Sequence, residues 1–287
     1  MIPARKGEVV AMKPFLKWAG GKYRLLSHIR RRLPAGRRLI EPFVGSGAVF
    51  LNTDYPAYIL ADINADVIAL YQILQDHGDE FIAYCKSMFI PENNTPERYY
   101  ELRAEFNMAH DIFRRAALFV YLNRHGYNGL CRYNRKGLFN VPFGRYPKPY
   151  FPEREMQYFA QKAAQATFVC EDFRSVMARA ERGDVIYCDP PYVPLSRTAN
   201  FRGYAAGGFS WEAQVDLARL ATELSQRGIP VLISNHATEF TSSAYAAAAQ
   251  ERIEVRRVIS CDGANRATAT EVLALFGDLP DGIAHNS

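Results

Sequence analysis

Short apolar runs bounded by turn residues predict seven strands along the chain. Five of these runs are continuously apolar, which is typical of strands buried on both faces of a sheet. They cover residues 37–43, 57–62, 167–173, 184–192 and 229–236. Two further runs, residues 251–260 and 271–276, are expected to close the sheet as an antiparallel pair.

Helical patterns separate these strands. Apolar residues at helical spacing predict a helix in residues 66–75, a pair of helices in 97–124 broken near His110 and Asp111, and a helix from Trp211 that Gly228 ends. The glycine-rich stretch 44–52 is expected to be a turn that opens a helix, and the alanine-rich stretch 244–250 a short helix. Glycine, asparagine and proline in residues 126–150 predict loops with a short hairpin.

Alternating strands and helices predict an α/β fold with a mostly parallel sheet and crossover helices. Ligands of such sheets bind beyond the carboxyl ends of the strands. Three polar features therefore share one predicted rim: the turn at residues 45–47, Asp62 and Asp189.

Composition narrows the class of protein. With 287 residues, 48% hydrophobic and 23% charged, the chain is expected to be an ordinary globular protein with a substantial core. No apolar run approaches the roughly 18 residues of a membrane helix, and residues 1–15 lack the apolar stretch of a signal peptide. Five scattered cysteines without a C-x-x-C pair, and histidines without ligand spacing, favour a reduced cytoplasmic protein with no metal site.

The excess positive charge lies in one segment. Residues 112–150 contain no Asp or Glu and eight Lys or Arg, whereas the rest of the chain has 27 basic against 30 acidic residues. Nine aromatic residues and four asparagines are interspersed among these basic residues. Arg and Asn pair with base edges, and aromatic rings stack on bases or insert between them, so the segment favours nucleic-acid binding over a merely solvated face.

Two stretches suggest an adenosine-containing cofactor. Gly45 and Gly47 would let a ligand approach the backbone, and Asp62, at the end of the next strand, could accept hydrogen bonds from ribose hydroxyls or cap a helix. The spacing is neither a Walker motif nor the full dinucleotide fingerprint. Trp18 and Lys22, just before a predicted helix, could provide a wall and a carboxylate clamp for an amino-acid moiety, or a core anchor and a helix start.

The stretch "DPPY", Asp189 to Tyr192, suits methyl transfer to an exocyclic amine. The lone pair of the adenine amine is delocalised into the ring, so the amine is a poor nucleophile. The Asp189 carboxylate and the rigid Pro190 carbonyl could accept its two N–H groups and localise that lone pair. Tyr192 could stack on the base, which must first be flipped out of a duplex. Prolines that merely end a strand are the simpler alternative.

The motifs "FLKWAGGK", "EPFVGSG", "LADIN" and "DPPY", in this order, resemble those of the N6-adenine DNA methyltransferases of the D12 class, group alpha. Residues 123–152 resemble the recognition region of the Dam-type, GATC-specific members, and the resemblance runs from Phe15 to about Phe276. It implies a Rossmann-like methyltransferase fold, with a catalytic domain in residues 1–64 and 152–287 and an inserted target-recognition domain in 65–151. It also implies S-adenosylmethionine as cofactor, S-adenosylhomocysteine as product and double-stranded DNA as substrate.

The resemblance assigns roles to matching positions. Catalysis would fall to Asp189, Pro190, Pro191 and Tyr192. The cofactor would contact Trp18, Lys22, Phe43, Gly45, Gly47, Asp62, Ile63 and Asp189. Lys17, Leu130, Arg132 and Pro142 would read base pairs, and Tyr127 would insert into the DNA. Further DNA contacts would come from Arg103, Arg124, Asn128, Asn134 and Arg145, and from Ser196 and Asn200 in a mobile loop over the flipped base.

Some positions depart from the family pattern. His125 stands where the family has a tyrosine, and "CDGANRATA", residues 261–269, replaces a more basic run, which would weaken phosphate contacts. Residues 1–11 lie outside the resemblance, and we hypothesise that translation begins at Met12. Detection of intact residues 1–11 by N-terminal mass spectrometry would refute this.

Alternative functions remain open at this stage. They are a methyltransferase acting on cytosine N4 or on protein glutamine, an adenine methylase of different or relaxed recognition sequence, and a DNA-binding protein without turnover. Asp189, where Ser or Asn is usual in the first group, favours adenine, and intact catalytic and cofactor motifs disfavour the last. We expect a monomer of bacterial, phage or mobile-element origin. Mismatch-repair marking, replication control and restriction protection are all compatible with the sequence, as are different degrees of processivity.

Overall fold

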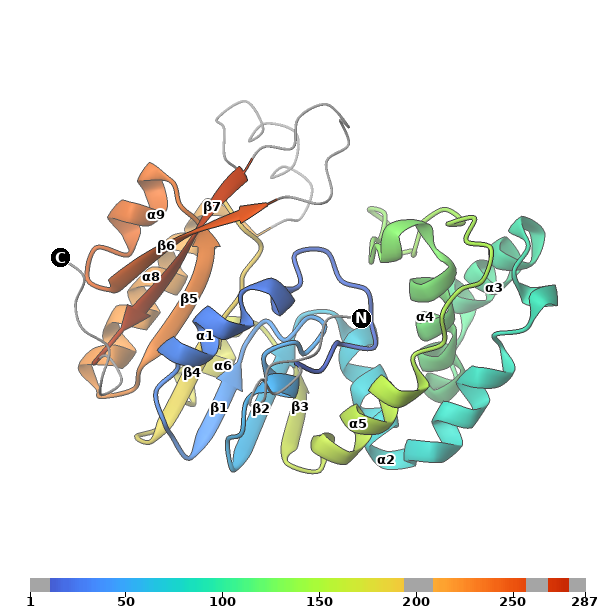
Figure 1. Cartoon of the computed structure of the whole chain (residues 1–287), viewed down its shortest axis with the longest axis horizontal. Helices are drawn as coiled ribbons and strands as arrows, with labels where there is room; N and C mark the ends of the chain where they lie inside the picture. Colours follow the sequence, from blue (N-terminus) through green and yellow to red (C-terminus); the bar gives the residue numbers. More distant parts are fainter. Residues whose placement is uncertain (1–10, 194–208, 257–267, 279–287) are drawn as a thin grey trace, which may run out of the picture. The chain divides into compact units, whose positions relative to one another are not determined.

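The computed structural model describes residues 11–193, 209–256 and 268–278. The chain forms two compact units, each built from separate stretches (Figure 1). The helical unit comprises Met1–Ser27, Gly45–Asp54 and Asn64–Gln165, and the sheet unit comprises His28–Val44, Tyr55–Ile63 and Ala166–Ser287. The boundaries of these units differ from those of the predicted catalytic domain, residues 1–64 and 152–287, and the predicted recognition domain, residues 65–151. The division into these two domains stays a prediction.

The sheet unit contains one seven-stranded sheet in the order β3-β2-β1-β4-β5-β7-β6. The strands are β1 (Arg38–Glu41), β2 (Ala57–Asp62), β3 (Ala166–Cys170), β4 (Asp184–Cys188), β5 (Val231–His236), β6 (Ala249–Arg256) and β7 (Thr268–Phe276). The pairs among β1 to β5 are parallel, whereas β7 runs antiparallel to both β5 and β6. The mostly parallel sheet and its antiparallel closing pair are thus confirmed.

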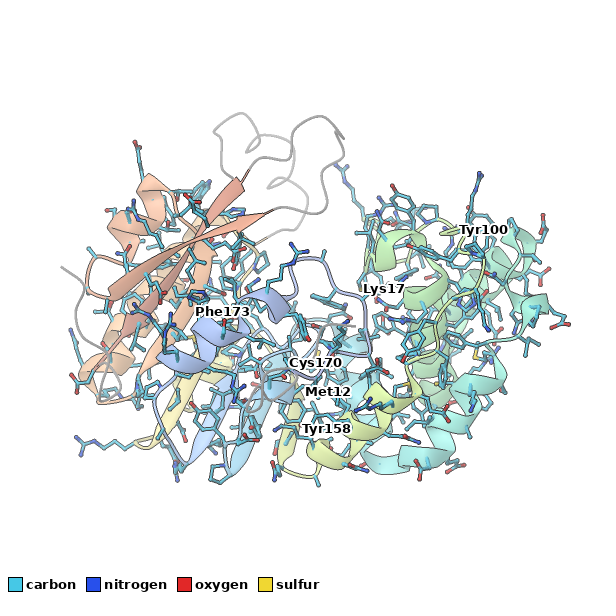
Figure 2. All side chains as sticks on the ribbon, in the orientation of Figure 1. Met12, Lys17, Tyr100, Tyr158, Cys170 and Phe173 are labelled. Carbon is cyan, nitrogen blue, oxygen red and sulfur yellow. The ribbon has the colours of Figure 1, made fainter. Side chains whose placement is uncertain are left out.

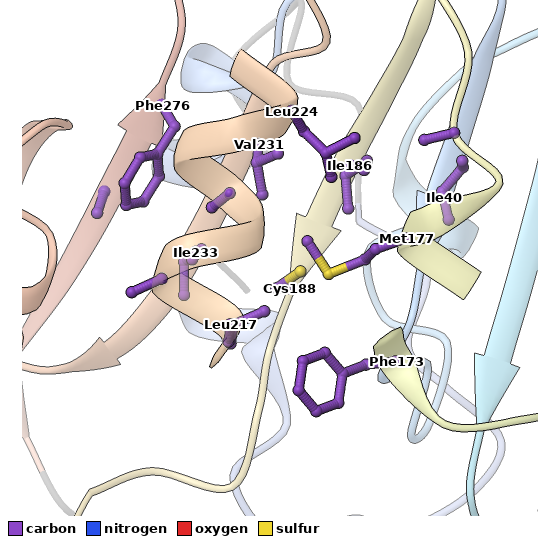
Figure 3. Close-up of a cluster of buried hydrophobic side chains, with 14 of the residues drawn as sticks. Ile40, Phe173, Met177, Ile186, Cys188, Leu217, Leu224, Val231, Ile233 and Phe276 are labelled. Carbon is purple, nitrogen blue, oxygen red and sulfur yellow. The ribbon is translucent and has the colours of Figure 1, made fainter. Parts of the chain in front are cut away.

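A buried apolar cluster covers one face of this sheet (Figure 3). Alternate strand residues such as Ile40, Ile186 and Ile233 meet Met177 of α6 (Phe173–Ala178) and Leu217 of α8 (Trp211–Gln226). This period-two alternation is what a strand with one face against helices requires. The sheet unit also contains most of α1 (Leu26–Arg32) and α9 (Glu239–Ala244).

One helix prediction is confirmed only in part and another is wrong. The predicted glycine-rich turn forms, with φ of 46° at Gly45 and 72° at Gly47, but the helix that follows it is only a 3-10 helix, Phe50–Asn52. The alanine-rich stretch is not a helix, because α9 ends at Ala244 and the chain turns into β6. There the Gln250 side chain donates to the carbonyls of Ser242 and Tyr245, and pairing with β7 outweighs the helix propensity of alanine.

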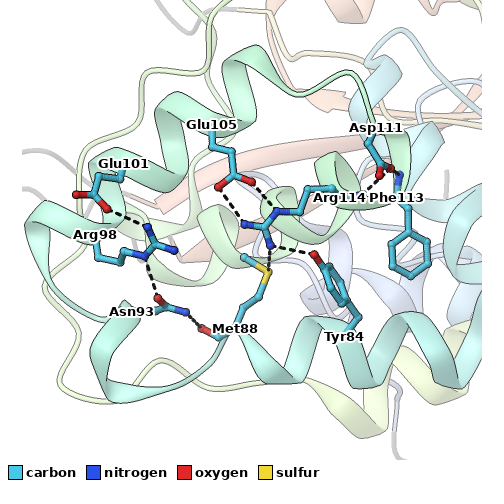
Figure 4. Close-up of polar contacts among 9 residues, drawn as sticks. All are labelled: Tyr84, Met88, Asn93, Arg98, Glu101, Glu105, Asp111, Phe113 and Arg114. Carbon is cyan, nitrogen blue, oxygen red and sulfur yellow. Dashed lines mark hydrogen bonds and ion pairs between the residues drawn. The ribbon is translucent and has the colours of Figure 1, made fainter.

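The helical unit is built from α2 (Ala65–Ser87), α3 (Pro96–Met108), α4 (Ile112–His125) and α5 (Glu153–Ala163), with 3-10 turns at Lys22–Arg24, Pro91–Asn93 and Tyr127–Gly129. The predicted break between α3 and α4 is confirmed, since the Asp111 carboxylate caps α4 by accepting from the amides of Phe113 and Arg114. Arg114 joins three helices, donating to both oxygens of Glu105 and to the Tyr84 hydroxyl (Figure 4).

No helix within the described ranges is both long enough and apolar enough to cross a membrane.

Candidate active site

Three predicted residues lie at or just beyond the carboxyl ends of β2, β1 and β4, which are neighbours in the sheet. Asp62 is the last residue of β2, Phe43 lies two residues beyond the end of β1, and Asp189 directly follows β4. The strand order reverses between β1 and β4, which is the position at which open α/β sheets bind ligands.

Asp189 directly follows β4, and its carboxylate is held by the neighbouring strand. The Ser234 hydroxyl of β5 donates to Asp189 Oδ1 at 3.0 Å. Ser234 also lies 3.1 Å from the hydroxyl of the fully buried Tyr187. Asp189 is half-buried at this rim, and the Ser234 hydroxyl orients one of its carboxylate oxygens.

Tyr192, at the end of the same turn, is fixed at both its ring and its hydroxyl. The hydroxyl donates to Glu271 Oε2 at 2.7 Å, and the ring meets the edge of His236 at 4.8 Å between centroids and 76° between planes. Burial, with the nearby carboxylates of Asp189 and Glu271, raises the pKa of Tyr192 well above its ordinary value. The phenol therefore stays neutral and presents a fixed aromatic face.

Aromatic side chains surround Phe43 on the sheet unit, and a large apolar residue follows Asp62. Phe43 stacks on Phe173 at 5.4 Å and meets Phe209 edge-on at 5.5 Å. Ile63, directly after Asp62, is 79% exposed, which is unusual for so large an apolar residue. A strand-end carboxylate beside exposed apolar surface fits an adenosine-containing ligand, whose ribose needs acceptors and whose base needs apolar contact.

The helical unit contains the other predicted cofactor residues. Trp18 packs against the turn at Gly45, where an added Cβ would lie 2.8 Å from the indole Nε1. The Gly45 carbonyl accepts from the Tyr71 hydroxyl at 2.5 Å. Lys22 is 6% exposed, and its ammonium donates to the Gly20 carbonyl at 2.6 Å. A largely buried ammonium fits the carboxylate end of an amino-acid moiety.

The predicted recognition segment of the helical unit forms a short irregular hairpin, as expected. Two isolated bridges, Gly126 with Phe143 and Tyr133 with Phe139, hold it together. Within it, the Arg132 guanidinium donates to the side chain of Asn140 at 2.7 Å and to its carbonyl at 3.2 Å.

The remaining predicted residues of this hairpin are surface or turn residues. Tyr127 is 51% exposed, Asn128 adopts φ of 52°, and Leu130 is half-buried. Asn134 accepts from two amides of the hairpin turn, while Pro142 and Arg145 are exposed. Ser196 and Asn200 lie outside the described residues.

Lys17 is locked against the hairpin by one buried asparagine (Figure 2 labels Lys17). Asn123 accepts from the Lys17 amide at 2.9 Å and donates to the Lys17 carbonyl at 2.8 Å. The ammonium lies 3.9 Å from the centre of the Tyr146 ring, and burial together with Arg124 lowers the pKa of Lys17. The sequence groups Asn123 with the asparagines expected to read bases, but its side chain bonds to the backbone of Lys17 instead.

Two predicted DNA contacts are engaged within the helical unit. The Arg124 guanidinium is mostly buried and donates to the carbonyls of Tyr150 at 2.9 Å and Phe15 at 3.4 Å. Arg103 donates to the Val141 carbonyl at 2.9 Å. In this arrangement both arginines support the hairpin, and their contacts with DNA stay predictions.

Sequence reasoning overlooked several residues that hold the Asp189 turn. Ser234, Asn235 and His236 end the buried strand β5, and Glu271 lies opposite His236 on β7. Consecutive polar residues at the end of an apolar strand were a usable signal, because such residues reach the ligand-binding rim of a parallel sheet.

The sheet order, with β7 inserted between β5 and β6, and the carboxylates at the ends of β2 and β4 are those of a Rossmann-like fold. The sequence profile of the D12 class N6 adenine-specific DNA methyltransferases matches residues 18–260. The chain belongs to this family.

Among curated relatives, the chain is 56% identical over 264 residues to the DNA adenine methylase of Escherichia coli (strain K12), covering 92% of this chain and 95% of the relative. It is 57% identical over 265 residues to that of Serratia marcescens, with 92% and 98% covered. It is 52% identical over 265 residues to that of Vibrio cholerae, with 92% and 96% covered. These matches span both units of the structure.

Proposed function

We propose that this adenine-specific DNA methyltransferase uses S-adenosylmethionine to methylate N6 of adenine within GATC in double-stranded DNA. The Asp189–Tyr192 turn carries the proposal: it presents an oriented carboxylate and a fixed aromatic ring at the ligand-binding rim of the sheet. The relatives named above, over nearly their whole lengths, are DNA adenine methylases, and the recognition segment resembles the GATC-specific type.

In the proposed mechanism, the Asp189 carboxylate and the Pro190 carbonyl accept the two N–H groups of a flipped-out adenine. This localises the lone pair on N6 and directs it out of the ring plane, while Tyr192 stacks on the base. S-adenosylmethionine, when bound, supplies the electrophilic methyl group. The Asp189 carboxylate also stabilises the positive charge that develops on N6, before the surplus proton leaves for solvent.

Cofactor binding is proposed for residues of both units. On the sheet unit, Asp62 would accept from ribose hydroxyls, and Phe43 and Ile63 would contact the adenine ring. On the helical unit, Lys22 would bind the carboxylate beside Trp18, and Gly45 and Gly47 would allow close approach. The half-buried carboxylates, exposed Ile63 and largely buried Lys22 support these roles.

DNA recognition is proposed for the hairpin and Lys17. Lys17, Leu130, Arg132 and Pro142 would read base pairs and exposed Tyr127 would insert into the duplex. Arg124, Asn134 and Arg145 would make phosphate or flanking contacts, Arg103 and Asn128 would also contact the DNA, and Ser196 and Asn200 would belong to a loop over the flipped base. One chain would act alone. The recognition domain is proposed as residues 65–151, and the catalytic domain as 1–64 and 152–287.

Methylation of a plasmid from a methylase-deficient host tests the proposal. After incubation with S-adenosylmethionine, we expect protection from a nuclease that cuts only unmethylated GATC and cleavage by one that cuts only the methylated site. Asp189→Asn should abolish both changes while DNA binding remains. Methyl transfer outside GATC would refute the assigned sequence, and transfer to a base other than adenine would refute the mechanism.

Arg132 offers a sharper test of base reading. Arg132→Ala should weaken discrimination between GATC and single-mismatch sites by about 1–3 kcal/mol, the value of one bidentate base contact. Arg135→Ala is the matched control, because Arg135 is an exposed arginine at the tip of the same hairpin. Equal discrimination by both variants would remove Arg132 from the recognition set.

A further inference from the structure

The backbone of the catalytic turn is held by two fully buried amide side chains of the sheet unit. Gln214 of α8 and Asn235 of β5 both have 0% exposure. Buried amides without partners cost free energy, so each amide group at such positions is expected to be hydrogen-bonded. Their partners show what the two residues orient.

Asn235 uses the whole hydrogen-bonding capacity of its side chain. Its Oδ1 accepts from the amides of Val193 at 3.0 Å and His236 at 2.9 Å. Its Nδ2 donates to Gln214 Oε1 and to the Tyr245 hydroxyl, both at 3.1 Å. Two accepted and two donated bonds allow only one orientation of the amide.

This orientation determines that of Gln214. Because Asn235 donates to the oxygen of Gln214, the Gln214 nitrogen must point the other way. It donates to the Pro191 carbonyl at 2.8 Å. A second link fixes the end of the turn, where the Val193 carbonyl lies 2.7 Å from His236 Nδ1. The carbonyls of the two consecutive prolines thus differ. The Pro191 carbonyl accepts a hydrogen bond from Gln214, whereas no group among the described residues donates to the Pro190 carbonyl.

We propose that Gln214 and Asn235 are positioning residues for methyl transfer. By holding the Pro191 carbonyl in the interior, they turn the preceding carbonyl, that of Pro190, toward the amine of the substrate. This inference rests on the proposed function, because it takes the Asp189–Tyr192 turn as the catalytic one. Neither residue touches the substrate; each acts through the direction of a backbone carbonyl.

Single-turnover kinetics separate this role from substrate binding. With full-length enzyme in excess over a GATC duplex and saturating S-adenosylmethionine, Gln214→Ala and Asn235→Ala should slow methyl transfer by about 10- to 100-fold, the effect of displacing a reacting group by about 1 Å. Dissociation constants for the duplex and the cofactor should change less than about threefold, because the variants leave the proposed contact residues in place.

Gln214→Met distinguishes hydrogen-bond donation from side-chain volume. Methionine has nearly the same length and volume but offers no N–H donor to the Pro191 carbonyl, so transfer should be as slow as in Gln214→Ala. Gln250→Ala is the matched control: this amide also holds backbone carbonyls in the sheet unit, those of Ser242 and Tyr245, but contacts nothing in the catalytic turn. It should keep the wild-type rate.

The outcomes are distinguishable. Wild-type rates in folded Gln214 and Asn235 variants, verified by circular dichroism at the assay temperature, would overturn the inference. So would a loss explained entirely by weaker DNA or cofactor binding, or an equal loss in Gln250→Ala. Failure of the wild-type enzyme itself to methylate adenine would instead refute the proposed function. If the alanine variants do not fold, Gln214→Met tests the inference by the same rate and binding criteria.

Discussion

His125 makes the stability of the helical unit depend on pH. This residue, where the family resemblance predicts a tyrosine, is 1% exposed at the end of α4. Its ring stacks on Tyr121 at 4.0 Å and lies 4.9 Å from Phe89, with Nδ1 2.9 Å from the Tyr121 carbonyl. Burial above all, with smaller contributions from Lys17 and Arg124, lowers the pKa of His125 to about 4.

The sign and size of the effect follow from this shift. The folded-state pKa lies below the ordinary value of 6.5, so the unfolded chain takes up the proton first as the pH falls. The stabilisation is therefore complete above about pH 6.5 and is lost progressively toward pH 4. Between pH 7.5 and pH 5.0, proton linkage predicts that His125 alone lowers the free energy of unfolding by about 2 kcal/mol.

Replacing the histidine by tyrosine, His125→Tyr, should remove this pH-dependent component of the stability. The chain has two tryptophans, Trp18 in the helical unit and Trp211 in the sheet unit, so a Trp211→Phe background reports on the unit that contains His125. Urea unfolding followed by fluorescence should show that the loss between the two pH values is about 2 kcal/mol smaller in the variant. His110→Tyr, at an exposed position, is the control. Identical losses in wild type and His125→Tyr would refute the reasoning.

Two further predictions concern the recognition hairpin and the catalytic turn. Gly129→Ala should lower the free energy of unfolding by about 2–4 kcal/mol, because φ is 62° and the new Cβ would lie 2.2 Å from Lys17 Cβ. Gly137 is the control, because its φ is 73° but an added Cβ would meet nothing within 4 Å. In the same urea assay, Gly137→Ala should lower the free energy of unfolding by only about 1–2 kcal/mol. Glu271→Leu should slow single-turnover methyl transfer by about tenfold, because it removes the acceptor of the Tyr192 hydroxyl. Glu271→Gln keeps an acceptor, so its rate should stay within about threefold of wild type. Equal rates in the two variants would contradict the role of Glu271 in orienting Tyr192.

The parts of the fold that were predictable have local causes. Continuous apolar runs predicted the parallel strands. Asp111 predicted the start of α4, which its side chain caps, and Gly228 predicted the end of α8, where it adopts φ of 78°. The rim residues followed from topology alone, because parallel strands bring their carboxyl ends together. Asp62 and Asp189 could therefore be grouped although they lie far apart in the sequence.

The parts that were missed depend on partners distant in sequence. The alanine-rich stretch has strong helix propensity, but the start of β6 is fixed by the far end of β7, where Ala249 pairs with Leu275. Asn123 looked like a base reader by composition, and only its position against Lys17, 106 residues away, shows that it is structural. Gln214 and Asn235 belong to different elements, and no spacing rule connects an amide on a helix with a carbonyl after another strand.

The stretch Asn64–Gln165, about one hundred residues, separates the paired strands β2 and β3. Closing so long a loop in an unfolded chain is entropically costly and slow, since non-local contacts form late. The same stretch, however, contains four helices with mostly local contacts, α2 to α5. If these helices form first, they bring the ends of the loop together before the strands pair. Newly synthesised chains should therefore acquire helical structure early, and pairing of β3 with β2 should be among the last steps of folding.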